Sequence, residues 1–353
     1  MDDHFGRSVG ISGIYAIVGA DDDDEISTSS GSAYIYQYGE TGWTQMQKIV
    51  PNDGAASDYF GSGVDISGNH AIVSAHYDDD KATNSGSAYI FTRNGDTWFQ
   101  TAKLTAADGA SSDYFGYYAV SLSGNYAIVG AYQDDNTYSN QGSAYIFKYD
   151  GSSWIQEIRI EASDRYSSDY FGRSVGIYGN YAIVGAYTDD DMGSDSGSAY
   201  IFVRDGTTWT EQAKLTASDG VASDHFGIAV AVYGDYAIVG ADDNDASGTN
   251  CGAAYIFKRD STTWSETVKL TPTDGASNDN FGSRVSISND YAIVTSYDDD
   301  DNGSNSGSVY IYKRNGSDWL FIQKLSASDS MPGDEFGASV ALSNELCHCR
   351  RTA

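Results

Sequence analysis

Cysteine, proline and basic residues are scarce in this sequence. Its 353 residues include 3 Cys, 3 Pro and 20 Lys and Arg, against 50 Asp and Glu, and the formal net charge is -30. Such a charge repels the phosphates of nucleic acids and anionic lipid surfaces, which proteins recognise through Lys and Arg patches. We therefore expect no nucleic acid and no membrane surface among its partners.

Long hydrophobic runs and helical patterns are absent as well. No stretch approaches the roughly 18 to 20 consecutive apolar residues that span a bilayer, so we expect no direct membrane insertion. No segment has apolar residues at a period of about 3.6 over the length of a helix, which predicts an almost entirely β chain. Apolar residues still make up 40% of the chain, which is enough for a packed core and excludes disorder.

One repeat of 55 or 56 residues fills the chain, and it is marked by the dipeptide Phe-Gly. The repeats begin near Phe5, Phe60, Phe115, Phe171, Phe226, Phe281 and Phe336. The six Trp share one register, at Trp43, Trp98, Trp154, Trp209, Trp264 and Trp319. In the fourth unit we expect four short strands, at residues 174–177, 181–184, 198–202 and 209–215, separated by two tight turns and one acidic loop.

This pattern predicts an all-β fold, a β-propeller of four-stranded blades. We expect six complete repeats plus the first strand of a seventh, seven blades in the intact protein, and one domain over residues 1–343. An open stack of sheets is the alternative, but nearly identical blades favour a closed ring. The Trp are then expected between blades. A basic residue repeated in the fourth strand is expected to protect an outer edge, at Lys48, Lys103, Arg159, Lys214, Lys269 and Lys324.

In four units Val-Gly-Ala follows Phe-Gly, at residues 18–20, 129–131, 184–186 and 239–241. This combination resembles the FG-GAP repeat family, which includes the propeller of integrin α subunits, from Phe5 to about Ser343. The resemblance implies extracellular adhesion or ligand binding on a blade scaffold, commonly with calcium. In integrin-type repeats the calcium ligands lie between Phe-Gly and Gly-Ala-Pro. Here that loop is a tight turn such as Ser123-Gly124-Asn125, so those ligands are not carried over.

The tail departs from the repeat. It reads Glu345-Leu346-Cys347-His348-Cys349-Arg350-Arg351, and Cys-x-Cys beside His would suit a metal ion. However, one legal encoding of this tail, shifted by one base, reads Asn-Tyr-Ala-Ile-Val-Gly-Ala, the sequence of residues 125–131 and 180–186. We therefore expect residues 344–353 to be a frameshifted or truncated tail, and the chain to be a piece of a longer protein.

Acidic residues are expected to crowd one face of the propeller. The loops between second and third strands would emerge beside the crossovers between units, and together they hold most of the acids, whereas the opposite turns carry Lys and Arg. Adjacent carboxylates repel one another and a hard cation relieves that repulsion, so calcium is the hypothesis. The candidate ligands are Asp22, Asp24, Asp78, Asp80, Asp134, Asp135, Asp189, Asp191, Asp243, Asp245, Asp298, Asp300 and Asn302. A solvated acidic face is the alternative, and the Asp two residues before each Phe is expected to cap its crossover turn.

Catalytic motifs are missing. An active site needs residues unlike their symmetry mates, but nearly every polar residue recurs in several units, and no G-x-S-x-G, P-loop or H-E-x-x-H motif occurs. We expect no enzyme, with a propeller lyase or hydrolase working at the central channel as the remote alternative.

Two other classes of function are open. A binding or adhesion module, extracellular or at the cell surface, would present the acidic face or loop aromatics such as Tyr132, Tyr187 and Tyr297 to a protein or glycan ligand. A structural surface-assembly or filament-forming repeat protein would instead bind copies of itself, with the acidic face against the mildly basic one. The sequons at Asn302 and Asn315 are candidate glycosylation sites and fit a secreted surface.

Overall fold

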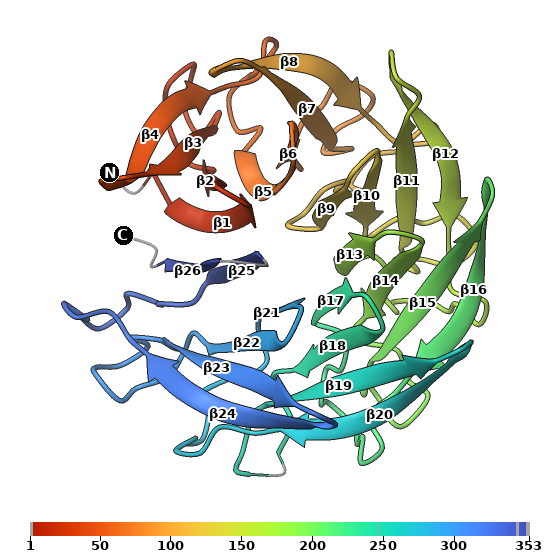
Figure 1. Cartoon of the computed structure of the whole chain (residues 1–353). Coiled ribbons are helices and arrows are strands. Elements are labelled where there is room, and N and C mark those ends of the chain that lie inside the picture. The colour runs from red at the N-terminus through yellow and green to blue at the C-terminus, as the bar shows by residue number, and fades with distance from the viewer. Residues whose placement is uncertain (1–2, 246, 344–345, 351–353) are drawn as a thin grey trace.

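The computed structural model describes residues 3–245, 247–343 and 346–350. Six four-stranded antiparallel sheets stand around a central channel, which confirms the predicted all-β propeller (Figure 1). In each blade the strands follow in chain order from the channel to the rim. None of the described residues form a helix long and apolar enough to cross a membrane.

The strands occupy equivalent positions in the six blades. The innermost strands are β1 (Phe5–Ser12), β5 (Phe60–Ser67), β9 (Val120–Ser123), β13 (Ser174–Tyr178), β17 (Ala229–Tyr233) and β21 (Val285–Ser288). The second strands are β2 (Tyr15–Ala20), β6 (His70–Ala75), β10 (Tyr126–Ala131), β14 (Tyr181–Ala186), β18 (Tyr236–Ala241) and β22 (Tyr291–Ser296). The third strands are β3 (Ser32–Gly39), β7 (Ser87–Asn94), β11 (Ser143–Tyr149), β15 (Ser198–Asp205), β19 (Ala253–Asp260) and β23 (Ser308–Asn315). The outermost strands are β4 (Gly42–Ile49), β8 (Thr97–Leu104), β12 (Trp154–Ile160), β16 (Thr208–Leu215), β20 (Thr263–Leu270) and β24 (Asp318–Leu325).

The seventh unit has two described strands rather than the single strand expected. Strand β25 (Ser339–Ser343) pairs with β26 (Leu346–Arg350), so part of the tail continues the sheet because its backbone can pair whatever its side chains are. Strand β25 lies between β21 and β1 and closes the inner ring (Figure 1). The Val9 N–H donates to Ser339 Oγ at 3.0 Å, and the Leu342 N–H donates to Ser286 Oγ at 3.1 Å. The rest of the expected tail, residues 344–345 and 351–353, lies outside the described residues.

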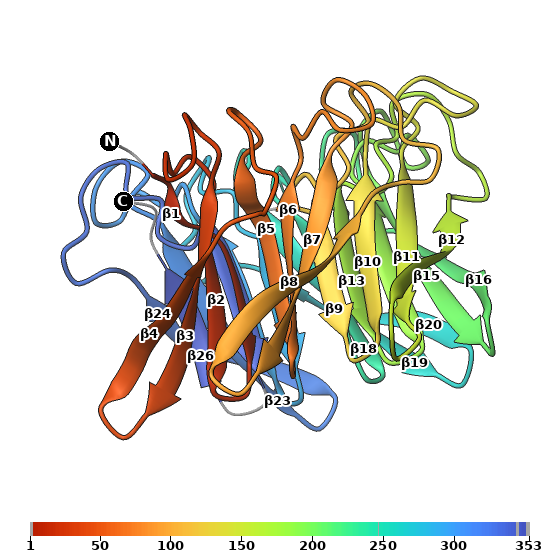
Figure 2. The same cartoon turned by 90° about the horizontal axis from the view of Figure 1, so that it is seen from above.

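The two faces of the disc differ in their loops. Figure 2 shows the long loops and crossovers on one side of the blades and the tight hairpin turns on the other. We call the first side the loop face and the second the hairpin face. The predicted grouping of the acidic loops with the crossovers is therefore confirmed.

The hydrophobic core lies between blades. Phe171 is fully buried, and its ring meets the Tyr200 ring of its own blade edge-on at 5.5 Å. The same cluster contains Ile128 and Ile146 of the preceding blade. Trp209 also bridges two blades, because its ring packs against Tyr126 at 6.1 Å. The interblade role predicted for the Trp is thus confirmed for Trp98, Trp209, Trp264 and Trp319.

Glycine is required where the backbones of neighbouring blades touch. A Cβ added to Gly185 would lie 1.9 Å from the Gly227 carbonyl oxygen of the next blade, and Gly130 and Gly240 meet the equivalent oxygens at the same distance. No side chain fits at that separation. The Val-Gly-Ala motif therefore marks a close backbone contact in four of the six complete blades, whereas Ser74 and Thr295 occupy the same position in the second and sixth.

The Gly185→Ala variant should lose about 2 kcal/mol or more of unfolding free energy, because a methyl group there forces two backbones apart. The matched control is Gly39→Ala, since a Cβ at Gly39 meets nothing within 4 Å. Urea unfolding of both variants measures the difference. Equal stabilities of the two variants would contradict this account of the blade contact.

Candidate functional site

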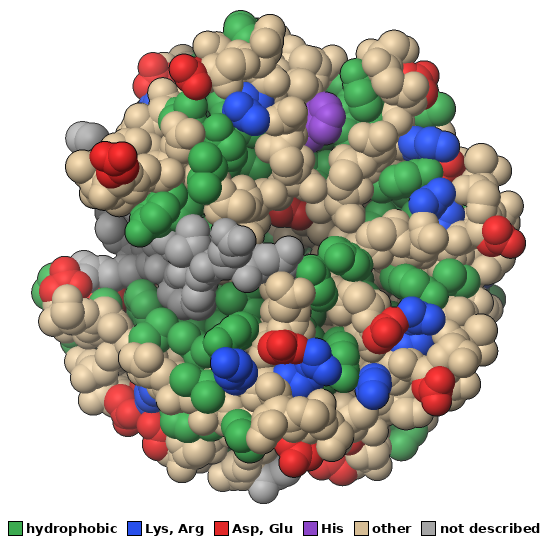
Figure 3. All heavy atoms as spheres, viewed as in Figure 1, with side chains coloured by type: hydrophobic (Ala, Val, Ile, Leu, Met, Phe, Trp, Pro, Cys, Tyr) green, Lys and Arg blue, Asp and Glu red, His purple; other side chains and the backbone are tan. Residues whose placement is uncertain are grey.

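The hairpin face and the loop face carry different charges. Figure 3 shows Lys and Arg side chains interspersed with hydrophobic and acidic ones on the hairpin face. Several of these cations have local partners, since Arg259 pairs with Asp235 and Arg314 with Asp290. The candidate ligands for calcium all lie on the loop face.

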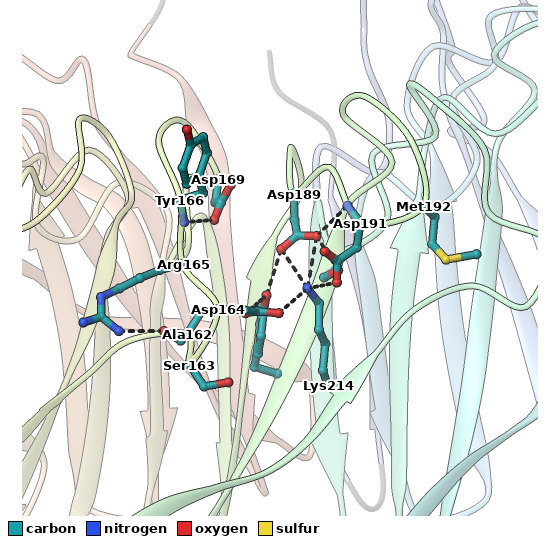
Figure 4. A network of polar contacts seen from close by, with 12 residues as sticks. Ala162, Ser163, Asp164, Arg165, Tyr166, Asp169, Asp189, Asp191, Met192 and Lys214 are labelled. Atoms are coloured by element: carbon teal, nitrogen blue, oxygen red, sulfur yellow. Dashed lines mark hydrogen bonds and ion pairs between the residues drawn. The ribbon is translucent and has the colours of Figure 1, made fainter.

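The carboxylates of each acidic loop surround a basic side chain from the outermost strand. In the fourth blade Lys214 Nζ lies 2.7 Å from Asp164 and 3.0 Å from Asp189, and it also pairs with Asp191 (Figure 4). The ammonium is 18% exposed and the Asp189 carboxylate only 5%. Lys214 therefore acts as an internal counterion for the loop.

The same contact recurs in all six complete blades at a spacing of 25 residues. The pairs are Lys48 with Asp23, Lys103 with Asp78, Arg159 with Asp134, Lys214 with Asp189, Lys269 with Asn244 and Lys324 with Asp299. The prediction that these basic residues lie on the outermost strand is confirmed, but their contact with the acidic loop was not predicted. Their fixed spacing from an acid in the loop is the signal that could have revealed it.

The buried carboxylate is also satisfied by neutral donors. Asp189 accepts hydrogen bonds from the Asp191 N–H at 3.1 Å, from Ser198 Oγ at 3.0 Å and from Tyr200 OH at 2.8 Å. In the second blade, burial alone would raise the pKa of Asp78, but hydrogen bonds from Lys103, the Asp80 N–H and Tyr89 lower it below its usual value. These groups hold the loop carboxylate in its charged form.

A calcium ion does not fit these loops while the lysine is seated. The carboxylate oxygens are suitable ligands for a hard cation, but in the fourth blade the ammonium already contacts all three of them. One carboxylate oxygen from each of Asp164, Asp189 and Asp191 lies within 4.8 Å of the others, a spacing that could suit a metal ion. The Lys214 ammonium contacts all three and occupies that place. The loop therefore binds its own cation.

The predicted ligands fall into five positions. Asp78, Asp134 and Asp189 are the buried carboxylates, and Asp80 and Asp191 are their partners on the same cation. Asp24, Asp135, Asp245 and Asp300 close the loop by accepting the N–H five residues later. Asp22, Asp243 and Asp298 precede the buried position. Asn302 and the second sequon residue, Asn315, are exposed.

The Asp two residues before each Phe caps the crossover turn, as predicted. Asp169 accepts a hydrogen bond from the Tyr166 N–H (Figure 4). Asp58, Asp113, Asp224, Asp279 and Asp334 make the equivalent contact. Burial raises the pKa of Asp169 to about 6, because the backbone hydrogen bond compensates only part of its desolvation.

Half-buried aromatic rings surround the channel mouth on the loop face. Six tyrosines form a continuous arc, which we call the aromatic arc: Tyr59, Tyr77, Tyr114, Tyr132, Tyr170 and Tyr187. Consecutive ring centroids lie between 5.3 and 6.0 Å apart. The arc continues to His225, whose ring is 5.4 Å from Tyr187. Two of the loop aromatics singled out in the sequence, Tyr132 and Tyr187, belong to it.

A second group of metal-ligating side chains lies where the arc ends. His225 Nδ1 is 2.8 Å from Asp243, and Asp242 completes a set whose ligand atoms lie within 4.8 Å of one another. Asn280 also donates to Asp243 at 2.9 Å. Of the predicted ligands, only Asp243 belongs to this group.

Three arginines line the channel beneath the arc. Arg7 and Arg284 line a cavity of about 390 Å³, and Arg173 and Arg284 line a neighbouring one of about 110 Å³. Arg7 Nε donates to Tyr118 OH at 3.0 Å, and the Arg173 guanidinium lies 5.2 Å from the centroid of the Tyr117 ring. Among the described residues, no carboxylate lies within 4.0 Å of these three guanidiniums.

Replacing Lys214 by Met should cost about 2–4 kcal/mol of unfolding free energy, because Asp189 then keeps a buried charge without its counterion. Lys258→Met is the control, since Lys258 is exposed, its ammonium lies 6.0 Å from the Tyr236 ring, and it forms no ion pair with the other described residues. Millimolar calcium should raise the melting temperature of the Lys214→Met variant by more than that of the parent, because only the variant has a vacant set of loop carboxylates in the fourth blade. Equal calcium-dependent rises in the variant and the parent would show that the lysine does not decide whether the loop binds the ion.

The variants Asp169→Asn and Asp164→Asn should respond to pH in opposite ways. The folded pKa of Asp169 is raised to about 6, so its charge costs stability as pH rises from about 4 to 6, and the Asn variant should gain about 1 kcal/mol at pH 7 only. For Asp164, burial is outweighed by hydrogen bonds from Lys214 and Tyr200, which lower its pKa. The Asn variant should therefore lose stability at pH 7, and the loss should shrink below about pH 4. Urea unfolding at both pH values tests the signs, and parallel responses would contradict them.

Comparison with known protein families identifies the same repeat that the sequence analysis found. The sequence matches the FG-GAP repeat over residues 1–36, 43–91, 98–147, 154–202, 209–257, 264–312 and 319–346. No curated protein matches the chain. Among solved structures it is similar to Saccharomyces cerevisiae Sqt1, with a TM-score of 0.49 and 10% identity over 99% of this chain and 81% of that chain. Since its repeats extend over nearly the whole sequence, the protein belongs to the FG-GAP repeat family.

Proposed function

We propose that the protein is a ligand-binding module that presents the aromatic arc to a glycan. The observation that carries the proposal is the arc itself, six partly exposed tyrosines in mutual contact at the mouth of a channel. Tyr rings supply a large, rigid contact area with a polar end, and they are enriched where proteins meet their ligands. An array of adjacent rings offers several flat faces to a chain of sugars.

The backbone supports a functional role for the arc. Tyr59, Tyr114 and Tyr170 have φ values of 55, 52 and 52°, in the left-handed region that disfavours large side chains. Glycine or asparagine would occupy these positions with less strain. The presence of tyrosine at three such strained positions favours a role of the rings in ligand binding over a role in stabilising the fold.

An extracellular or cell-surface location and a part in adhesion complete the proposal. Family membership and the exposed sequons at Asn302 and Asn315 support that location. Calcium belongs to the proposal at His225, Asp242 and Asp243, because no Lys or Arg pairs with that group in the described structure. We propose no catalytic activity.

Binding of the labelled protein to an array of immobilised glycans tests the proposal. We expect binding to a subset of glycans, and a loss of at least tenfold in affinity for Tyr132→Ala. Tyr38→Ala is the matched control, because Tyr38 lies near the end of strand β3 at the hairpin face, away from the channel, and is 43% exposed. Absence of glycan binding, or equal losses in the two variants, would overturn the proposal.

A further inference from the structure

We propose that the channel mouth binds the carboxylate of an acidic sugar through Arg7, Arg173 and Arg284. The inference rests on the proposed function and deepens it by assigning the class of ligand. Its basis is a cluster of guanidiniums that share two neighbouring cavities and have no carboxylate within 4.0 Å among the described residues.

The three arginines interrupt the repeat, as expected of a binding site that occurs once. Arg7 and Arg173 stand two residues after their Phe. The other complete units have Ser62, Tyr117, Ile228 and Ser283 at that position. Arg284 stands one residue further on and is also without an equivalent basic residue in the other units. Blade packing therefore does not require these cations, because the other blades form without them.

Their mutual repulsion favours an anion in the cavity. Burial, together with the charges of Arg173 and Arg7, lowers the pKa of Arg284, although Tyr297 and Asp242 act in the opposite direction. The chain has 50 acidic and 20 basic residues, so most Lys and Arg side chains can form an ion pair with a carboxylate. The contrast is Lys214, which contacts three carboxylates. A planar guanidinium binds a carboxylate through two parallel hydrogen bonds, which makes that group a suitable partner.

Acids lie near the arginines, but none of those in the described structure is within 4.0 Å of a guanidinium. Asp65 lies in the wall of the larger cavity, but its carboxylate accepts hydrogen bonds from the Leu122 N–H at 2.7 Å and Ser121 Oγ at 3.1 Å. Asp21 contacts His4 at 3.2 Å on the loop face.

Asp242 is buried, and its charge partly offsets those of Arg173 and Arg284, but it forms no ion pair with either in the described structure. Arg284 Nη1 donates to the Ser283 carbonyl at 2.6 Å, and the remaining guanidinium donors of the cluster can bind a ligand.

The surroundings of the arginines favour a sugar over a simple anion. Tyr117 and Tyr118 offer ring faces beside the guanidiniums, and the arc continues outward through Tyr132, 5.1 Å from Tyr117. His76 is 3% exposed, its ring lies 4.8 Å from Tyr117, and its Nδ1 has no hydrogen-bond partner in the described structure. Apolar walls with a few convergent polar groups are typical of small-molecule sites. The acidic loops outside would repel long polyanions, so a single anionic sugar is the best match.

Isothermal titration calorimetry with glucuronic acid tests the inference. Glucose, which lacks the carboxylate, is the neutral control ligand. We expect saturable binding of glucuronate and at least tenfold weaker binding of glucose. Arg284→Met and Arg173→Met should each weaken glucuronate binding at least tenfold. Arg93→Met is the control for net charge, because Arg93 lies on the hairpin face, where it pairs with Asn69. A thermal melt of each variant checks that the fold is intact.

Three results would overturn the inference. The first is no glucuronate binding up to about 10 mM, a concentration that would detect affinities of a few kcal/mol. The second is equal affinity for glucose or for a Gly-Glu dipeptide, which would remove the sugar acid as the recognised group. The third is unchanged binding in both arginine variants. Binding of neutral glycans that depends on Tyr132 but not on the arginines would leave the proposed function standing while this inference fails.

Discussion

The propeller depends on a close approach of neighbouring blades, which in four of the six complete blades is a backbone contact with no room for a side chain. Gly185 faces the Gly227 carbonyl of the next blade, and the same contact recurs at Gly19, Gly130 and Gly240. Beside each contact lies a Phe ring that is inaccessible to solvent, as at Phe171 and Phe226. The glycine fixes how closely the blades approach, and the Phe fills the space that this approach creates. Interior packing at such density tolerates little change in volume, so the repeat length and the Phe vary little along the chain, and the glycine is replaced only by the small residues Ser74 and Thr295.

The placement of charge follows from this geometry. The crossover and the acidic loop emerge together, which crowds carboxylates on one face, and a cation from the outermost strand at each loop relieves the repulsion. The hairpin-face arginines pair with local groups such as Asp235 and Asp290. After these pairs are formed, the guanidiniums at the channel mouth have no carboxylate within 4.0 Å in the part of the chain that the structure describes. A strongly acidic protein thus has a positively charged group of side chains at its centre.

The fold could be predicted from the sequence because its signals are local and repeated. Turn dipeptides, alternating strands and the Phe-Gly spacing each act within one unit, and six units give the same pattern. The Asp caps could be predicted for the same reason. The loops were harder, because the run of acids around Asp298 and Asp300 hides which residue is buried. The structure buries Asp299 against Lys324, while Asp300 closes the loop and Asp298 contacts Asn305.

The channel mouth could not be predicted, because its residues are brought together only when the ring closes. Arg7, Arg173 and Arg284 belong to the first, fourth and sixth units, and within each unit they look like ordinary variation at a surface position. One extra residue in the third unit adds to this asymmetry. It lies at Tyr117–Tyr118, between two residues that both hydrogen-bond to Gly130, and it brings the Tyr118 hydroxyl to Arg7 of the first blade. Repetition therefore builds the scaffold, and the few departures from repetition meet at its axis, where a binding site can differ from its symmetry mates.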